Sequence, residues 1–305
     1  MRRDRRPCAP LSVPRPGRRL SFWKRLGNST RPGKHSRRET TIPDPSAPIL
    51  LFDSGVGGLS VYDALRRIMP DAPVIYAADL AGLPYGTKTE PQVAARVAGL
   101  LGRMSERFAP RLVCIACNTA STIALGMVRD VLEVPIVGTV PAIKPAAAAT
   151  RSGVIGLVGT GATIRQTYVD DLETRFAAGK LLHRIAAPGL VALAEDKLRG
   201  HPLDLVAVEE ARAGLAAMER GEEIDTLVLA CTHFSLLKEE LGAAFGLDVA
   251  LVDGADGIAR RIAHLLEGQE IAPAPSRFVV TGPLEAAAGL EPCLAARGFL
   301  AVEPF

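Results

Sequence analysis

The sequence predicts a mixed α/β protein with two lobes, each built around a mostly parallel sheet. The first observation behind this prediction is that short apolar runs alternate with longer segments whose apolar residues recur at helical spacing. Strands that alternate with helices in this way form βαβ units, in which the strands are parallel. The second observation is an internal similarity between two parts of the chain, which predicts that the lobes resemble each other.

Taken in order, the elements begin with Ile49–Phe52, a continuous apolar run that is typical of a buried strand and leads into a glycine-rich turn. The same pattern predicts further strands, the last two of them at edges: Val74–Ala78, Leu112–Ala116, Pro135–Thr139, Val154–Val158, Leu181–Ile185, Thr226–Ala230, Val249–Val252, Phe278–Thr281 and Phe299–Val302. The predicted helices are Val61–Met69, Val93–Phe108, 118–131, Ile143–Ala149, Thr163–Phe176, Val206–Met218, Leu236–Phe245 and Ile258–Leu266.

The internal similarity centres on two cysteines. The strand before Cys117 and the strand before Cys231 both end in Ala-Cys, and a threonine-containing turn follows each. The two cysteines are 114 positions apart, and the turns at Asp53 and Gly159 are separated by a similar distance. We therefore expect a first lobe from residues 48–141 plus 250–305 and a second lobe from residues 142–249.

Residues 1–47 differ in character from the rest of the chain. The first 40 residues carry 13 Lys and Arg but two acidic residues, a net +11, which leaves −8 on the remainder of a chain whose total is +3. Seven prolines and few apolar residues predict disorder. The segment could be a basic arm for nucleic acid or acidic surfaces, or a transit peptide. The third interpretation is a dispensable extension, or a product of translation that begins upstream of the true start. We favour the last interpretation, so no nucleic-acid partner is expected.

Composition narrows the class of protein and its compartment. With 48% hydrophobic and 23% charged residues, the chain can build a substantial core, which excludes wholesale disorder. An odd number of cysteines, five, argues against a secreted disulfide scaffold. There is no apolar run of membrane-spanning length and no signal-peptide apolar region. We expect a cytoplasmic protein without a membrane partner.

Cys117 and Cys231 are the candidate reactive groups. Both follow the carboxyl end of a predicted strand and precede a predicted helix. Ligands in open α/β sheets bind at this edge, and a helix N-terminus favours a thiolate there, so we expect a lowered pKa at both thiols. Cys114, three residues before Cys117 and inside the predicted strand, is predicted to belong to the core.

Four interpretations are consistent with the types and spacing of these cysteines. Cys114 and Cys117 could form a redox C-x-x-C pair, although the first cysteine lies within a strand. Cys114, Cys117, Cys231 and His233 could bind zinc. One cysteine could be an acyl-transfer nucleophile with His233 as its base, which leaves the second unexplained. Two equivalent thiols could face one ligand from opposite sides, an arrangement suited to removing a proton from one face of a carbon and delivering another to the opposite face.

The neighbouring residues are suited to a small carboxylated ligand. The turn from Asp53 to Gly58 exposes N–H donors at a helix start, but its spacing fits neither a dinucleotide fingerprint nor a Walker loop. Side-chain donors and acceptors follow both cysteines, and a loop aromatic follows the second strand: Asn118, Thr119, Thr232, His233 and Pro84-Tyr85-Gly86.

At this point the chain resembles a known family, the glutamate racemases within the aspartate/glutamate racemase superfamily. The motifs that carry the resemblance occur in family order between about residues 49 and 266: Asp53-Ser-Gly-Val-Gly-Gly58, Pro84-Tyr-Gly86, Cys117-Asn-Thr-Ala120, Gly159-Thr-Gly-Ala-Thr163 and Cys231-Thr-His233. One departure is Phe234-Ser235, where the family usually has proline shortly after the histidine and aromatic residue.

The resemblance implies cofactor-independent interconversion of L- and D-glutamate, with no metal, to supply D-glutamate for peptidoglycan. It implies two flavodoxin-like lobes related by a pseudo-twofold axis, with the active site in the cleft between them, and we expect a homodimer. Cys117 and Cys231 would be the paired bases, and Asp53 and His233 would assist the thiols. Glu195 is a looser match to a supporting glutamate. The substrate-binding residues implied are Asp53, Ser54, Pro84, Tyr85, Gly86, Asn118, Thr119, Thr163, Thr232 and His233. The alternatives are a racemase for aspartate or another amino acid and a small-ligand or zinc-binding module.

Overall fold

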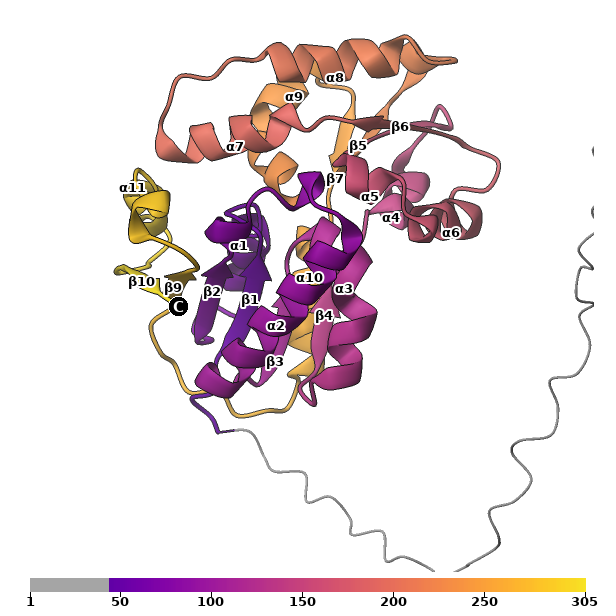
Figure 1. Ribbon diagram of the computed structural model, residues 1–305. Coiled ribbons are helices and arrows are strands. Elements are labelled where there is room, and N and C mark those ends of the chain that lie inside the picture. The colour runs from indigo at the N-terminus through magenta and orange to yellow at the C-terminus, as the bar shows by residue number, and fades with distance from the viewer. Residues whose placement is uncertain (1–43) are drawn as a thin grey trace, which may run out of the picture. The chain divides into compact units, whose positions relative to one another are not determined.

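Two parallel sheets organise residues 44–305, the part of the chain that the computed structural model describes (Figure 1). The six-stranded sheet has the order β10 (Val302–Pro304), β9 (Arg277–Val280), β2 (Val74–Ala78), β1 (Ile49–Asp53), β3 (Leu112–Ile115) and β4 (Ile136–Gly138). The four-stranded sheet has the order β6 (Leu181–Ala186), β5 (Val154–Gly159), β7 (Thr226–Ala230) and β8 (Ala250–Val252). Every strand pairing is parallel, as the sequence predicts.

The two sheets repeat one strand order. The first contains β2-β1-β3-β4 and the second is β6-β5-β7-β8, so β1 corresponds to β5 and β3 to β7. Cys117 follows β3 and Cys231 follows β7. The internal similarity in the sequence therefore reflects equivalent positions in two lobes.

Helices connect the strands, as βαβ units require. Their bounds are α1 (Leu59–Ile68), α2 (Glu90–Phe108), α3 (Asn118–Val131), α4 (Ile143–Ala149), α5 (Gly161–Ile164), α6 (Thr167–Phe176), α7 (Gly189–Arg199), α8 (Val206–Ala216), α9 (Lys238–Phe245), α10 (Ala255–Leu265) and α11 (Glu291–Ala295). Short 3₁₀ turns are η1 (Leu80–Gly82), η2 (Tyr85–Thr87), η3 (Gly221–Glu223), η4 (Thr232–Leu237) and η5 (Leu284–Ala287). None of the helices within residues 44–305 is both long and apolar enough to cross a membrane.

The local sequence explains where the longest helix begins and ends. The backbone N–H of Thr89 donates to Gln92 Oε1 at 3.0 Å, and Pro91 lies in the first turn of α2. These are features of a helix start. The helix ends at Ala109, which has a left-handed φ of 41° and whose N–H donates to the carbonyl of Ser105.

Both faces of the six-stranded sheet are covered. Leu51 and Tyr76 point into one core with α1 and α10, and Leu50 and Phe52 point into another with α2 and α3. Alternate residues of the same strand thus enter opposite cores, and every residue of β1 is buried. This burial on both faces is why the predicted strands are continuous apolar runs.

The structure corrects several predicted boundaries. β8 pairs with β7, so residues 250–252 belong to the four-stranded sheet, although they were predicted to belong to the first lobe. The predicted helix Thr163–Phe176 is divided into α5 and α6. The helix predicted to begin at Leu236 begins at Lys238, because a 3₁₀ turn precedes it. Helix α7 was not predicted.

Arg111, just before β3, fixes the chain that enters the first lobe. Its guanidinium donates to the carbonyl oxygens of Asp44 at 2.9 Å, Pro45 at 2.8 Å and Ala47 at 2.8 Å. Residues 44–47, which were predicted as part of a disordered tail, are therefore bonded to the folded body. The remainder of that prediction, residues 1–43, lies outside the described residues.

Candidate active site

A small cavity of about 20 Å³ brings the two cysteines together at the carboxyl ends of both sheets. A space of this size admits about one water molecule. Its lining comes from both lobes: Ser54, Leu83, Pro84, Tyr85, Gly86, Cys117, Asn118, Thr119, Thr160, Val191, Cys231, Thr232 and His233. Ten of the thirteen predicted site residues line this cavity, and the other three, Asp53, Thr163 and Glu195, do not.

Cys117 is the N-terminal cap of α3. Its Sγ accepts a hydrogen bond from the N–H of Ala120 at 3.5 Å and lies 3.6 Å from Ser54 Oγ. Burial, followed by the negative charge of Asp53, raises the pKa of this thiol to about 12, and the Ala120 N–H and the Ser54 hydroxyl lower it less. The expectation that the helix N-terminus lowers the pKa of Cys117 is therefore wrong, because burial outweighs that effect.

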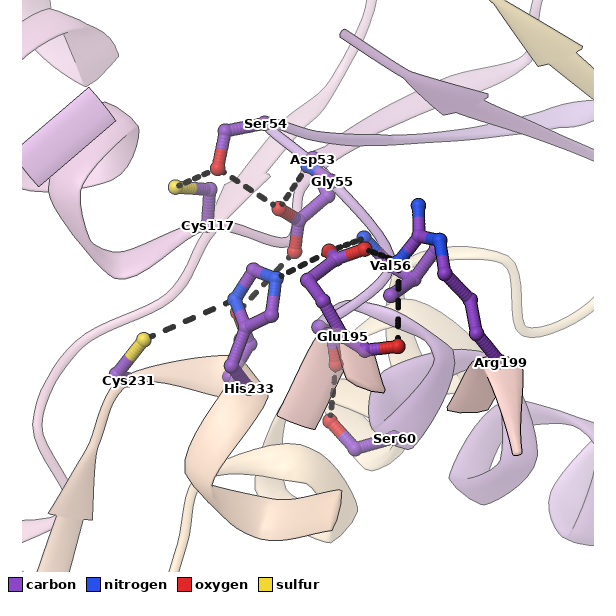
Figure 2. Close-up of polar contacts among 12 residues, drawn as sticks. Asp53, Ser54, Gly55, Val56, Ser60, Cys117, Glu195, Arg199, Cys231 and His233 are labelled. Atoms are coloured by element: carbon purple, nitrogen blue, oxygen red, sulfur yellow. Dashed lines mark hydrogen bonds and ion pairs between the residues drawn. The ribbon is translucent and has the colours of Figure 1, made fainter. Parts of the chain in front are cut away.

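Asp53 is fully buried and does not line the cavity. Figure 2 shows its carboxylate among the polar contacts of the site. Its Oδ1 accepts from the N–H of Gly55 at 2.9 Å and from Ser54 Oγ at 3.2 Å, and its Oδ2 accepts from Thr232 Oγ1 at 3.1 Å. Burial raises the pKa of this carboxyl, and the charge of His233 and these hydrogen bonds oppose the shift.

Cys231 faces a chain of charged side chains. Its Sγ lies 3.9 Å from His233 Nδ1, and His233 Nε2 lies 3.0 Å from Glu195 Oε1 on α7 (Figure 2). Glu195 Oε1 also accepts from the N–H of Val56 at 3.3 Å, and its other oxygen is paired with Arg199. The loosely matched Glu195 is thus placed directly behind His233.

The pKa values of His233 and Glu195 shift in opposite directions. Burial alone would lower the pKa of His233, but its contacts with Cys231 and Glu195 raise it well above the usual value. Burial would raise the pKa of Glu195, but the hydrogen bond to His233 and the pairing with Arg199 lower it to about 2. A protonated imidazole next to an ionised carboxylate is the consequence.

The turn that follows β1 needs glycine because it lies very close to residues of the second lobe. A Cβ on Gly57 would lie 2.5 Å from His233 Nδ1 and 2.6 Å from its backbone nitrogen. A Cβ on Gly55 would lie 2.8 Å from Glu195 Oε1. The turn that follows β1 therefore contacts the His233–Glu195 pair without room for side chains.

A cluster of hydroxyls joins the lobes on the other side of the cavity. Thr119 Oγ1 lies 3.1 Å from Thr160 Oγ1 and 3.3 Å from Thr163 Oγ1. Thr160 lines the cavity and was not predicted, whereas the predicted Thr163 is fully buried behind it. The buried Asn118 Oδ1 has no hydrogen-bond partner within the described chain.

The loop at Pro84-Tyr85-Gly86 forms one wall. The Leu83–Pro84 peptide bond is cis, and the ring of Tyr85 is buried at the cavity. The hydroxyl of Tyr85 donates to Asp79 Oδ2 at 2.5 Å, so it points away from the ligand space. Gly86 approaches Thr160 of the second lobe, where a Cβ would lie 3.2 Å from the threonine Cβ.

Cys114 does not take part in the cavity. It is buried in the same core as Leu51 and Tyr76, and burial raises its pKa. Among residues 44–305, no three His, Cys, Asp or Glu side chains are grouped so that they could hold a metal ion. Cys114, Cys117, Cys231 and His233 thus do not form the zinc site considered as an alternative.

Comparison with known proteins identifies the family. The model of the Asp/Glu/Hydantoin racemase family matches residues 56–262, more than half of the chain. The chain belongs to this family.

Curated members of this racemase family that match the chain include glutamate racemases. That of Sphingopyxis alaskensis is 63% identical over 227 residues, which cover 74% of this chain and 85% of the relative. That of Salmonella typhimurium is 46% identical over 228 residues, which cover 74% and 80%.

Solved racemase structures share the two-lobe fold. Escherichia coli glutamate racemase, in complex with L-glutamate and the activator UDP-MurNAc-Ala, is 40% identical with a TM-score of 0.79, and the match covers 85% of this chain and 98% of that one. Thermus thermophilus glutamate racemase, in complex with β-chloro-D-alanine, is 35% identical with a TM-score of 0.68, covering 86% and 98%. The predicted two-lobed α/β fold is confirmed.

Proposed function

We propose that this racemase interconverts L- and D-glutamate, with Cys117 and Cys231 as the two bases, and so supplies D-glutamate for peptidoglycan. The observation that carries the proposal is that both cysteines, at equivalent strand ends of the two lobes, line one cavity. The relatives that cover most of this chain are glutamate racemases. No cofactor or metal is part of the proposal.

The surroundings of the two thiols support opposite starting roles. With a pKa of about 12, Cys117 is a thiol at neutral pH and can donate a proton. Cys231 Sγ lies 3.9 Å from His233 Nδ1, and the raised pKa of His233 keeps a positively charged imidazole beside this sulfur. The sulfur of Cys231 would remove the α-proton from one face while the Cys117 thiol delivers a proton to the other. For the opposite enantiomer the roles are exchanged.

Polar groups around the cavity would hold the amino acid. The unpartnered Asn118 Oδ1 can accept a hydrogen bond from an ammonium group. The hydroxyls of Thr119 and Thr232 can bind a carboxylate, and burial of these groups strengthens their effect on the charge that develops at the α-carbon.

Incubation of the purified protein with L-glutamate or L-aspartate, followed by chiral chromatography, tests the proposal. We expect D-glutamate to accumulate until the two enantiomers are equal, and we expect little conversion of aspartate. Conversion of aspartate but not glutamate would favour the alternative racemase. No conversion of any amino acid by a folded protein would contradict the proposed function.

We propose that the enzyme acts in the cytoplasm as a homodimer. The four cysteines of residues 44–305, Cys114, Cys117, Cys231 and Cys293, are all free thiols, as a reducing compartment maintains them. Light scattering of the protein as it elutes from a size-exclusion column measures the oligomeric state. A monomer at micromolar concentration would contradict the dimer.

A further inference from the structure

Asp79 is a buried carboxylate that the proposed reaction does not use. Asp79 directly follows the end of β2, just as Asp53 is the last residue of β1. The side chain of Asp79 is 0% exposed. Its backbone N–H donates to the Asp53 carbonyl at 2.8 Å, so the two acidic residues lie on neighbouring strand ends. Asp79 does not line the cavity. A charged group removed from water needs partners, and the identity of those partners indicates its role.

Three side chains from separate parts of the first lobe converge on Asp79. Arg96 of α2 binds it with two nitrogens, Nε to Oδ2 at 2.5 Å and Nη2 to Oδ1 at 2.6 Å. Tyr85 donates its hydroxyl to Oδ2 at 2.5 Å, and Thr281, after β9, donates to Oδ1. Two-point pairing with arginine fixes the orientation of a carboxylate as well as its charge.

The contact with Tyr85 connects this ion pair to the substrate cavity. Tyr85 is 2% exposed, so its hydroxyl proton would lack an acceptor if Asp79 could not accept it. The same residue and its neighbours Pro84 and Gly86 form one cavity wall. The preceding loop closes around Asp79, because a Cβ on Gly82 would lie 2.3 Å from Asp79 Oδ2.

We propose that Asp79 is a positioning residue for substrate binding, which acts through Tyr85 to hold the wall at Pro84–Gly86 while Arg96 and Thr281 hold Asp79. The proposal rests on the proposed function, because it assigns this wall to glutamate binding. A wall that contacts substrate and transition state alike contributes uniform binding, so its displacement raises KM more than it lowers kcat.

Kinetics of Asp79→Asn and Tyr85→Phe, with glutamate of each configuration, test this role. Loss of one hydrogen bond to a charged partner predicts a KM increase of about tenfold in each variant, with kcat reduced by less than about threefold. Because Asp79→Asn weakens the same contact that Tyr85→Phe removes, Tyr85→Phe is expected to add little to KM in the Asp79→Asn background. Arg96→Lys, which keeps a positive charge, should retain more of the wild-type KM than Arg96→Met.

Arg277→Met is the matched control. It breaks an ion pair with Glu303 in the same sheet, at strands β9 and β10. We expect its KM to remain at the wild-type value even if its melting temperature falls. If Asp79→Asn does not fold, the conservative Tyr85→Phe variant still decides the question.

An unchanged KM in folded Tyr85→Phe and Arg96→Met, or additive effects in the double variant, would overturn the inference. So would an equal rise of KM in Arg277→Met, because the effect would then follow from loss of stability alone. The proposed function fails separately, by absence of glutamate racemisation in the wild-type protein.

Discussion

Thr232 Oγ1 donates a 3.1 Å hydrogen bond to Asp53 Oδ2. Thr232, which follows Cys231, is thereby bonded to the carboxylate of Asp53. That carboxylate also accepts from Ser54, whose hydroxyl lies next to Cys117. This single contact crosses from the end of β7 to the end of β1. The two halves of the site consequently share one hydrogen-bonded network, and a change on one side is expected to be felt on the other.

Replacement of either cysteine tests the two-base mechanism. Cys117→Ser and Cys231→Ser should each reduce racemisation by about 10²–10⁴-fold, the range for loss of a positioned acid or base. The remaining thiol should still exchange the α-proton of one enantiomer in D₂O, and the preferred enantiomer should differ between the two variants. Mass spectrometry with chiral separation measures this exchange, and wild-type racemisation in both variants would rule out the mechanism.

The close approach of the glycine turn predicts a severe effect of Gly57→Ala. The added methyl group would lie 2.5 Å from His233 Nδ1, so the turn or the imidazole must move, and we expect loss of activity with a lower melting temperature. Gly102→Ala in α2 is the control, because no atom outside its helix lies within 4 Å of the new Cβ. Alanine in a helix interior should stabilise by about 1 kcal/mol. Equal activity of both variants would contradict the geometry.

The lowered pKa of Glu195 predicts how stability depends on pH. Since its pKa is about 2 in the folded protein against 4.5 ordinarily, its contribution is fully present above about pH 4.5 and is lost as the pH falls toward 2. The shift corresponds to on the order of 3 kcal/mol. Urea unfolding at pH 6 and pH 3 should therefore show a smaller loss of stability in Glu195→Gln than in the wild type.

Asp196→Asn is the control for that experiment. Asp196 is the next residue of α7, and its half-exposed side chain contacts His201 at the surface. We expect Asp196→Asn to follow the wild-type pH dependence. If Glu195→Gln follows it as well, Glu195 is not held ionised by His233 and Arg199.

The raised pKa of Cys117 predicts slow alkylation at neutral pH. Because the thiolate is the reactive form and the pKa is about 12, the rate of modification by iodoacetamide should rise about tenfold per pH unit between pH 7 and pH 10. Ser54→Ala removes a hydroxyl that lowers this pKa, so it should slow the reaction further. Peptide mass spectrometry separates Cys117 from the other cysteines. A rate that levels off below pH 9 would contradict the assignment.

The small cavity predicts that the lobes must separate to admit glutamate. Space for about one water cannot contain an amino acid. The two lobes also touch where Gln166 Nε2 donates to Glu90 Oε1 at 2.7 Å. In a Glu90→Cys/Gln166→Cys variant, oxidation of the two new thiols to a disulfide should abolish turnover, and reduction of that disulfide should restore it. The single-cysteine variants serve as controls. Full activity of the joined form would show that substrate enters without separation of the lobes.

Much of the fold could be predicted because each buried strand is recorded locally as an apolar run. Three-residue strands such as β8 carry too little pattern to show which sheet they join, and β8 was assigned to the wrong lobe. Helix α7 was missed although it carries Glu195. Its position behind His233 depends on packing between segments distant in the sequence.

The candidate site could be located from the sequence where a reactive side chain follows the end of a predicted strand, as at Cys117 and Cys231. Asp79 was missed because an isolated aspartate before Leu-Ala-Gly carries no adjacent motif. A signal was available, since Asp79 follows β2 as Asp53 ends β1. The raised pKa of Cys117 was not predictable from its place at a helix start, because burial is a property of the assembled lobes.

The two thiols lie in unlike surroundings, one beside a serine and a buried aspartate and the other beside a histidine backed by a glutamate and an arginine. Mirror-image substrates have equal free energies in water, so racemisation has an equilibrium constant of unity, and the ratio kcat/KM must be the same in both directions whatever the protein does. The dissimilar surroundings can therefore change kcat and KM for each enantiomer only in the same proportion. Under saturating conditions one enantiomer would turn over faster and bind more weakly than the other, in compensating proportion, while the final mixture stays racemic.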